Sequence, residues 1–179
     1  TGNAPERAQP VLDSLEAAGL TTTSFSVSGE PTTDLIMAAT DLARSSDSDV
    51  VVAVGGGSVI DTGKAVAALL TNPASLMDYL EVIGAGQPLT QSPAPCVAIP
   101  TTAGTGAEVT KNAVLGSTEH KVKVSMRHPE MAPNLAIIDP ELTWSMSQSL
   151  TASTGLDALT QLLEAFVSRQ ANPMTDALC

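Results

Sequence analysis

An apolar segment followed directly by glycines constrains the fold more than any other feature of this sequence. Residues 50–54 are all apolar, residues 55–57 are glycines, and a helical pattern runs from residue 58 to residue 70. An apolar run without polar alternation is typical of a central parallel strand that is covered on both faces. Glycines between a strand and a helix direct the free N–H groups of the helix beyond the end of the strand. The pattern therefore predicts an α/β domain with an anion-binding turn.

The glycine turn matches neither of the two common phosphate-binding motifs. It is not a Walker A loop, because one residue too many separates Gly57 from Gly63, and Ala65 stands where Ser or Thr would be required. It is not Gly-x-Gly-x-x-Gly, because Ile60 occupies the third glycine position. We expect Ser58 to cap the helix and Asp61 to complete a capping-box-like pair. The alternative to an anion-binding turn is a turn with a capped helix and a structural role only.

The other elements follow from apolar periodicity and from breakers. We expect helices at residues 11–18, 33–43 and 58–70, the second capped by Thr32 or Thr33, and strands at residues 25–27, 50–54, 96–99, 121–125 and 135–138. Alternating helices and strands predict an α/β fold with a parallel sheet. The character of the sequence changes near Leu142, after which one helix has an apolar face from Leu156 to Val167. We therefore expect an α/β domain at residues 1–144 and the start of a helical domain at residues 145–179.

Composition excludes several classes of function. The 179 residues include 8 Lys and Arg against 19 Asp and Glu, a net charge of −11, which disfavours nucleic-acid binding. No apolar run approaches the ~18 residues of a membrane span. The two cysteines, Cys96 and Cys179, form no disulfide framework, so we expect a cytoplasmic protein. Because Thr1 is not an initiator Met, and because a helix expected to begin at Pro173 has no C-cap signal before Cys179, we expect a fragment of a longer protein.

A second polar loop follows another predicted strand. The segment Pro100-Thr101-Thr102-Ala103-Gly104-Thr105-Gly106 offers hydroxyl groups and flexible backbone directly after residues 96–99. Ligands of open α/β sheets bind beyond the carboxyl ends of the strands, where both this loop and the glycine turn are expected. The two loops can therefore face one ligand, with a simple polar turn as the alternative.

Three segments in register resemble the iron-containing (group III) alcohol dehydrogenases. They are residues 55–65, residues 100–110 and residues 155–160. The resemblance implies a dinucleotide-binding, dehydroquinate synthase-like α/β domain, here lacking its first strand, followed by an all-helical domain. It also implies a nicotinamide cofactor, NAD or NADP, and a divalent metal, Fe²⁺ or Zn²⁺, in the cleft between the two domains.

The resemblance also implies roles for individual residues. Gly56, Gly57 and Ser58 would hold the cofactor pyrophosphate, and Asp61 would lie towards the nicotinamide. The cofactor would further be lined or flanked by Thr101, Thr102, Thr105, Lys123 and Leu142. Without the resemblance, Lys123 is an exposed strand lysine.

The metal site is where the sequence departs from the family. Members typically supply an Asp and, four residues later, a His, but here Asp157 is followed by Gln161. A carboxamide oxygen is a weaker ligand than an imidazole, so metal affinity should fall or another residue must replace it. Glu164 lies one turn further on, whereas His120 and His128 are expected in solvated turns. Without the resemblance, Asp157 is a carboxylate that favours a helix N-terminus.

We therefore expect an NAD(P)-dependent alcohol dehydrogenase that transfers a hydride between the cofactor and a small alcohol, aldehyde or ketone, assisted by a metal. The alternatives are a metal-independent reductase of the maleylacetate reductase type, a hydroxyacid-oxoacid transhydrogenase, and a non-catalytic nucleotide-binding fragment. Gly2 stands where many members have an Asp that would repel a 2′-phosphate, so we expect tolerance of NADP, with Arg7 near the phosphate. We expect a homodimer, and no membrane or nucleic-acid partner.

Overall fold

A three-stranded parallel sheet forms the centre of the molecule. The computed structural model describes all residues, 1–179. The strands are β1 (Val51–Gly55), β2 (Cys96–Pro100) and β5 (Leu135–Ala136), in the order β1-β2-β5. Val51 lies opposite Cys96 and Val97 lies opposite Leu135. The parallel α/β architecture is therefore confirmed, and the apolar run forms a strand as expected.

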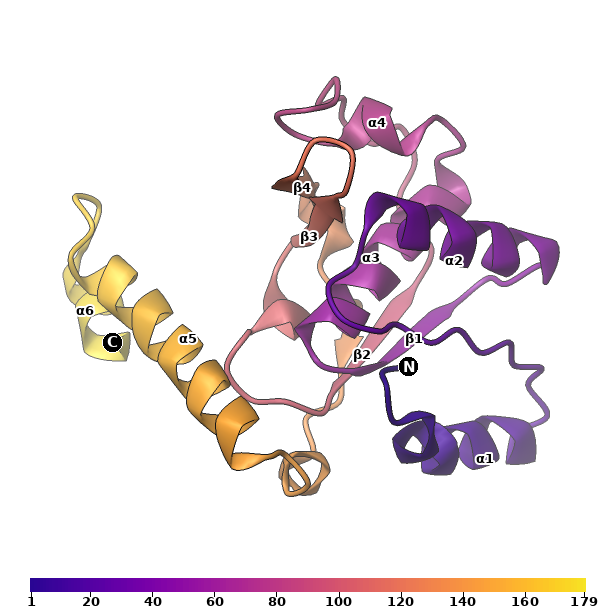
Figure 1. The fold of residues 1–179 in the computed structure, drawn as a ribbon, viewed down its shortest axis with the longest axis horizontal. Helices are drawn as coiled ribbons and strands as arrows, with labels where there is room; N and C mark the ends of the chain where they lie inside the picture. Colours follow the sequence, from indigo (N-terminus) through magenta and orange to yellow (C-terminus); the bar gives the residue numbers. More distant parts are fainter.

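Helices cover both faces of this sheet (Figure 1). The 3-10 helix η1 (Pro5–Ala8) and α1 (Gln9–Ala17) lie on one side, where Ala8 packs with Val54 and Ile99. On the other side lie α2 (Thr33–Ser45) and α3 (Gly57–Thr71). Helix α3 packs closely on β1 at Gly63. A Cβ atom at this position would lie only 2.8 Å from the Cβ of Ala53. Alternate side chains of β1 and β2 are thus buried on opposite faces of the sheet, Ala53 and Ala98 on one and Val54 and Ile99 on the other.

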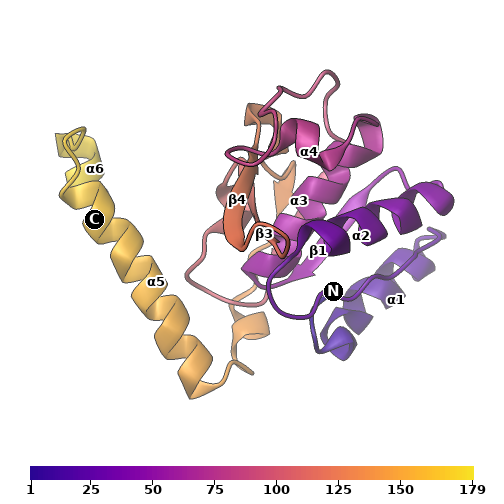
Figure 2. The same ribbon diagram turned by 45° about the horizontal axis from the view of Figure 1, so that its top comes forward.

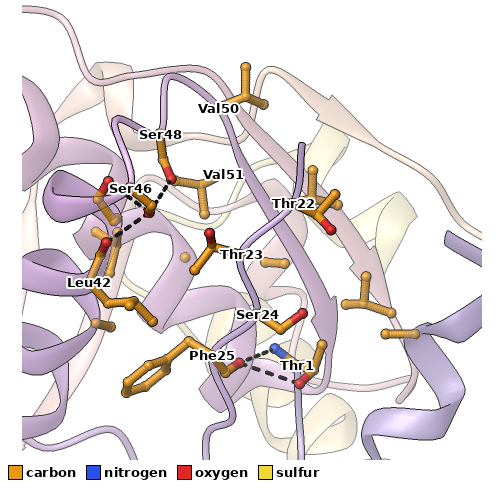
Figure 3. A pocket seen from close by; sticks show the side chains of 18 of the residues that line it. Thr1, Thr22, Thr23, Ser24, Phe25, Leu42, Ser46, Ser48, Val50 and Val51 are labelled. Carbon is orange, nitrogen blue, oxygen red and sulfur yellow. Dashed lines mark hydrogen bonds between the residues drawn. The ribbon is translucent and has the colours of Figure 1, made fainter. Parts of the chain in front are cut away.

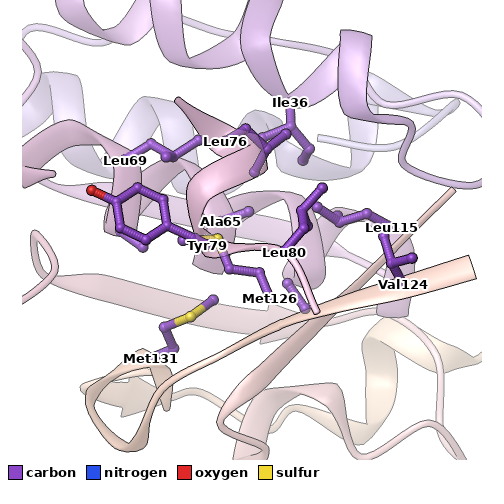
Figure 4. Packing of buried hydrophobic residues seen from close by; sticks show 12 residues of the cluster. Ile36, Ala65, Leu69, Leu76, Tyr79, Leu80, Leu115, Val124, Met126 and Met131 are labelled. Atoms are coloured by element: carbon purple, nitrogen blue, oxygen red, sulfur yellow. The ribbon is translucent and has the colours of Figure 1, made fainter. Parts of the chain in front are cut away.

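The largest core cluster lies beside the sheet rather than on it. An antiparallel hairpin of β3 (Asn112–Ser117) and β4 (Val122–Arg127) packs against α2, α3 and the short α4 (Leu76–Tyr79). Figure 4 shows Ile36, Leu69, Leu80 and Met126 meeting there, and each is at most 1% exposed. Sequence reasoning found β4 but missed β3. Asn112 and Gly116 lower the strand propensity of the segment, and its pairing comes from β4.

One predicted strand does not form, and another is shorter than expected. Residues 25–27 form no strand; instead Val27 N donates to Thr1 O at 2.8 Å. Thr1 N donates to Phe25 O, also at 2.8 Å (Figure 3). These two hydrogen bonds form a parallel pair between Thr1 and the segment 25–27. A single paired residue is too short to form a β-ladder. The strand expected at residues 135–138 is only β5, although Ile137 N still donates to Ala98 O.

The C-terminal part is helical and stands apart from the sheet (Figure 2). After the 3-10 helices η2 (Ala107–Val109), η3 (Pro129–Met131) and η4 (Pro140–Thr143) come α5 (Gln148–Phe166) and α6 (Pro173–Leu178). Helix α6 begins at its proline as predicted, with Asn172 as N-cap. The apolar side chains of α5 are exposed: Leu156, Leu159, Leu162, Leu163 and Phe166. Of all the helices, none has both the length and the apolar character needed to cross a bilayer.

Candidate functional site

A cavity of about 490 Å³ brings together residues that are far apart in the sequence. Its walls are the N-terminus of α3, the segment from Thr105 to Thr110, the β3–β4 hairpin, the turn at Glu30 and one face of α5. Of the residues expected to bind cofactor or metal, those that line it are Gly57, Ser58, Asp61, Thr105, Lys123, Asp157 and Gln161.

Helix α3 begins without a side-chain cap. Its N-cap is Gly56, and no side chain accepts a hydrogen bond from the first turn. The expectation that Ser58 caps this helix with Asp61 as its partner is therefore wrong. Ser58 lies inside the first turn, because the chain already enters the helix at Gly57. The first N–H groups of a long helix with a glycine N-cap are available to an anion.

The two glycine-containing loops are in contact above the sheet. A Cβ atom at Gly56 would stand 3.2 Å from the Thr102 side chain, and one at Gly57 would stand 3.0 Å from the Thr105 side chain. Thr101 N also donates to Gly55 O at 2.9 Å, which holds the start of the second loop to the end of β1. The threonine hydroxyls and the helix N-terminus thus lie on one surface, and a bulkier side chain at either glycine would crowd it.

The remaining expected cofactor residues lie outside the cavity wall. Gly56, in the middle of the glycine turn, lies next to the side chain of Thr102. Thr101 is buried, with 5% of its surface exposed. Leu142 packs against the cluster of Ala8, Val54 and Ile99 on the face of the sheet that carries α1.

A buried lysine that sequence reasoning missed fixes one wall of the cavity. Lys64 Nζ forms an ion pair with Asp61 at 2.9 Å and donates to Ala107 O at 2.8 Å, to Thr110 Oγ1 at 3.0 Å and to Asn112 O. The lysine side chain is 0% exposed. The only sequence feature that could have predicted this ion pair is the spacing of Lys64 three residues after Asp61 in a largely apolar helix.

Asp61 has a structural partner as well. Its Oδ2 accepts a hydrogen bond from Val114 N at 3.0 Å, which ties β3 to α3. Asp61 therefore lines the cavity as a carboxylate whose charge is balanced by Lys64, rather than as a helix cap.

Lys123 and Glu30 meet at the mouth of the cavity. They form an ion pair, and their side chains are 63% and 62% exposed. The turn that carries Glu30 is held in place, because Gly116 N donates to Pro31 O at 2.8 Å. Lys123 is the only basic residue in the cavity wall, while Glu30, Asp61 and Asp157 are acidic.

The residues expected to hold a metal do not form a complete site. Asp157 and Gln161 are exposed, one turn apart on α5, and both line the cavity. Nowhere do three His, Cys, Asp or Glu side chains gather in a way that could hold a metal ion. Gln161 Nε2 donates to Gly104 O at 3.1 Å. Of the three carboxylates in the cavity wall, Glu30 and Asp61 are in ion pairs with lysines, which leaves Asp157 as the carboxylate best placed to bind a metal.

The two histidines take part in local turns. His120 Nδ1 lies 3.1 Å from Ser117 Oγ, and His128 Nδ1 accepts from Glu130 N at the start of η3. Arg7 donates to Ser145 O at 3.5 Å, and Gly2 lies near Val59 of α3. None of these four residues lines the cavity.

A second cavity of about 480 Å³ lies between α1, α2 and β1 (Figure 3). Its lining is mostly apolar, and Thr1, Thr22, Phe25, Leu42 and Val51 are among the residues that border it. It holds none of the expected cofactor or metal residues.

The chain is similar to known proteins over most of its length. The profile of the family described as iron-containing alcohol dehydrogenase matches residues 2–140. Choline dehydrogenase of Bacillus subtilis (strain 168) is 41% identical over 172 residues, which cover 96% of this chain and 42% of that protein. NAD-dependent methanol dehydrogenase of Bacillus methanolicus is 36% identical over 170 residues, which cover 94% of this chain and 44% of that protein.

Solved structures show the same likeness. A 1,3-propanediol oxidoreductase matches with a TM-score of 0.86 and 37% identity, covering 96% of this chain and 44% of that one. An alcohol dehydrogenase from Oenococcus oeni matches with a TM-score of 0.87 and 32% identity, again covering 96% and 44%. The chain therefore spans less than half the length of these relatives.

Proposed function

The chain belongs to the iron-containing alcohol dehydrogenase family, and on that premise we propose that the protein is an NAD(P)-dependent oxidoreductase. It transfers a hydride between the nicotinamide ring and the carbon of a small alcohol, aldehyde or ketone. Two relatives act, by their names, on choline and on methanol, which supports a small alcohol as substrate.

One observation carries the proposal. The uncapped N-terminus of α3 and Thr105 of the second loop meet at the wall of a cavity of about 490 Å³, and Thr102 lies next to Gly56 beside it. We assign the cofactor pyrophosphate to the backbone N–H groups of Gly57 and Ser58, since a helix N-terminus stabilises phosphate charge. Thr102 and Thr105 supply hydroxyl groups beside it. These residues bind and orient the cofactor, which itself carries the redox chemistry.

Lys123 and Asp61 have separate parts in this proposal. Lys123 Nζ, at the cavity mouth, donates to a ribose hydroxyl or to a phosphate of the cofactor. Asp61 keeps its ion pair with Lys64 and holds the hairpin through Val114 N, so that it shapes the nicotinamide end of the cavity. Thr101 and Leu142 support the loop and the sheet behind the cofactor.

A divalent metal, iron or zinc, fits this chain only in part. We propose Asp157 as a ligand. Asp157 and Gln161 together supply at most two ligands and no third lies with them, so no step of the reaction is derived through a metal here. The hydrogen bond from Gln161 to Gly104 favours a second candidate, a metal-independent reductase of the maleylacetate reductase type.

The test uses the full-length protein. NADH and NADPH binding is measured by nicotinamide fluorescence, and turnover is measured with a panel of small alcohols and aldehydes, for wild type, Gly57→Ala and Gly155→Ala. A Cβ atom at Gly57 would crowd Thr105, whereas one at Gly155 would meet nothing within 4 Å. We expect Gly57→Ala to weaken binding by about tenfold and Gly155→Ala to leave it unchanged. Absence of nicotinamide binding in the wild type would contradict the proposal.

The assembly and the location belong to the same proposal. We propose a homodimer in the cytoplasm. Light scattering on the full-length protein gives the mass of the assembly, and fractionation of the source cells gives the location.

A further inference from the structure

The loop at residues 101–106 is held from two sides. On one side, Thr102 and Thr105 contact Gly56 and Gly57 at the start of α3. On the other side, Gly104 lies against α5, where a Cβ atom would stand 2.2 Å from Thr154 O. Gly104 has a φ of +142°, a conformation that only glycine adopts readily. The loop therefore joins the proposed cofactor site to the first helix of the C-terminal part.

Gln161 makes the polar contact of this junction. Thr154 and Gln161 lie two turns apart on the same face of α5, because a helix repeats every 3.6 residues. A long helical side chain leans towards the N-terminus of its helix, which brings the Gln161 carboxamide back towards the loop. Its Nε2 donates to Gly104 O at 3.1 Å.

The carboxamide oxygen faces the same loop. Gln161 Oε1 is the nearest atom to a Cβ position built at Gly106, at 3.9 Å. Both ends of the carboxamide are thus directed at residues 104–106, while Asp157 lies one turn earlier on the helix. A residue that served as a metal ligand would instead direct its oxygen to the same point as Asp157, whereas the Gln161 carboxamide is directed at Gly104 and Gly106.

We propose that Gln161 is a positioning residue that holds the loop at residues 101–106 in its cofactor-binding shape, and that it is not a metal ligand. The proposal rests on the proposed function, because the loop is the wall assigned to the cofactor. Loss of the Gln161 hydrogen bond frees the Gly104 carbonyl and lets the loop move away from the glycine turn. Thr102 and Thr105 then lose their fixed places beside the pyrophosphate.

The variant that tests this is Gln161→Met in the full-length protein. Methionine is close to glutamine in length, carries no N–H donor and is a poor ligand for Fe²⁺ or Zn²⁺. The matched control is Gln148→Met, an exposed position in the first turn of the same helix. Three quantities are measured: amide hydrogen exchange of residues 101–106, NADH affinity, and bound metal by elemental analysis.

The expected result is faster exchange of the loop amides and a rise of about fivefold in the NADH Kd, the effect of losing about one hydrogen bond. Bound metal is unchanged, and the control matches wild type. Gln161→Asn, which keeps the amide on a shorter side chain, restores the exchange rate only in part. The last comparison separates loss of the hydrogen bond from general disruption of the helix.

Two outcomes would overturn the inference. Exchange at wild-type rates in Gln161→Met would show that the hydrogen bond does not hold the loop. Loss of bound metal in Gln161→Met but not in Gln148→Met would show that Gln161 is a ligand. Hydrogen exchange needs no cofactor, so it decides this inference even if the protein binds no nicotinamide and the proposed function fails.

Discussion

Lys64 and Asp61 form an ion pair of 2.9 Å beneath the glycine turn, and the lysine side chain is completely buried. The same ammonium group donates to three residues of the segment 107–112, and Asp61 accepts from Val114 N. A buried charge is tolerated only when it is paired and its hydrogen bonds are satisfied. This pair therefore connects α3 with η2 and β3, two elements that form the cavity wall.

Replacing Lys64 should destabilise the fold strongly. Lys64→Met leaves Asp61 without its counter-charge and three acceptors without their donor. We expect the free energy of unfolding in urea to fall by about 3–5 kcal/mol. Lys111→Met, at an exposed position, is the control and should change stability little. Equal stability of Lys64→Met and wild type would show that the network contributes nothing.

Glu30 should weaken cofactor binding through Lys123. The carboxylate neutralises the only basic side chain of the cavity wall and repels an anionic ligand. We expect Glu30→Gln to lower the NADH Kd by about threefold at low salt, and less at high salt. In a Lys123→Met background the same substitution should have a smaller effect, which a double-mutant cycle measures. A Kd that rises in Glu30→Gln would contradict this interpretation.

Cys96 should make the protein less stable at alkaline pH. Burial raises the pKa of its thiol from 9.0 to about 11, and the charge of Lys64 opposes only part of that rise. Between pH 9 and pH 11 the unfolded chain releases this proton and the folded chain keeps it. The contribution of the protonated Cys96 thiol to the free energy of unfolding is therefore fully present below pH 9. It is lost as the pH rises towards 11, by at most about 1.4 kcal/mol per pH unit.

Cys96→Ala tests this dependence, because its unfolding free energy should decline less between pH 9 and pH 10.5 than that of wild type. Cys179→Ala is the matched control, since Cys179 is exposed. A thiol reagent at pH 8 should modify Cys179 in the folded protein and leave Cys96 unmodified until the protein unfolds. Identical pH slopes for Cys96→Ala and wild type would refute the prediction.

Asn72 should anchor the long loop before β2. The side chain is completely buried, and its Oδ1 accepts from Thr90 N and Gln91 N while its Nδ2 donates to Gln91 O. Asn72→Ala leaves two amides of the loop without an acceptor, so we expect a loss of about 2–3 kcal/mol and faster amide exchange at residues 89–92. Gln87→Ala, in the same loop but exposed, should behave like wild type.

Local sequence signals predicted the elements that depend on nearby residues. The strand at β1, the glycine turn, the Thr32 cap of α2 and the proline start of α6 all rest on short-range geometry. Strand β3 was missed because its pairing is supplied by β4, and the predicted Ser58 cap was wrong because the helix already begins at Gly57, with Gly56 as its N-cap. Which residue is the N-cap depends on the backbone angles at one position. The residue types around the turn do not determine those angles.

The sequence by itself determined the parallel α/β class, the place of the anion-binding turn and the family resemblance, because each depends on the order and spacing of residues along the chain. Only the tertiary structure decided which side chains share the cavity: that Lys64 is buried on Asp61, that Glu30 pairs with Lys123 and that Gln161 reaches Gly104. These contacts join residues up to 93 positions apart. They arise from the packing of the loops and helices around the sheet, which periodicity and spacing do not encode.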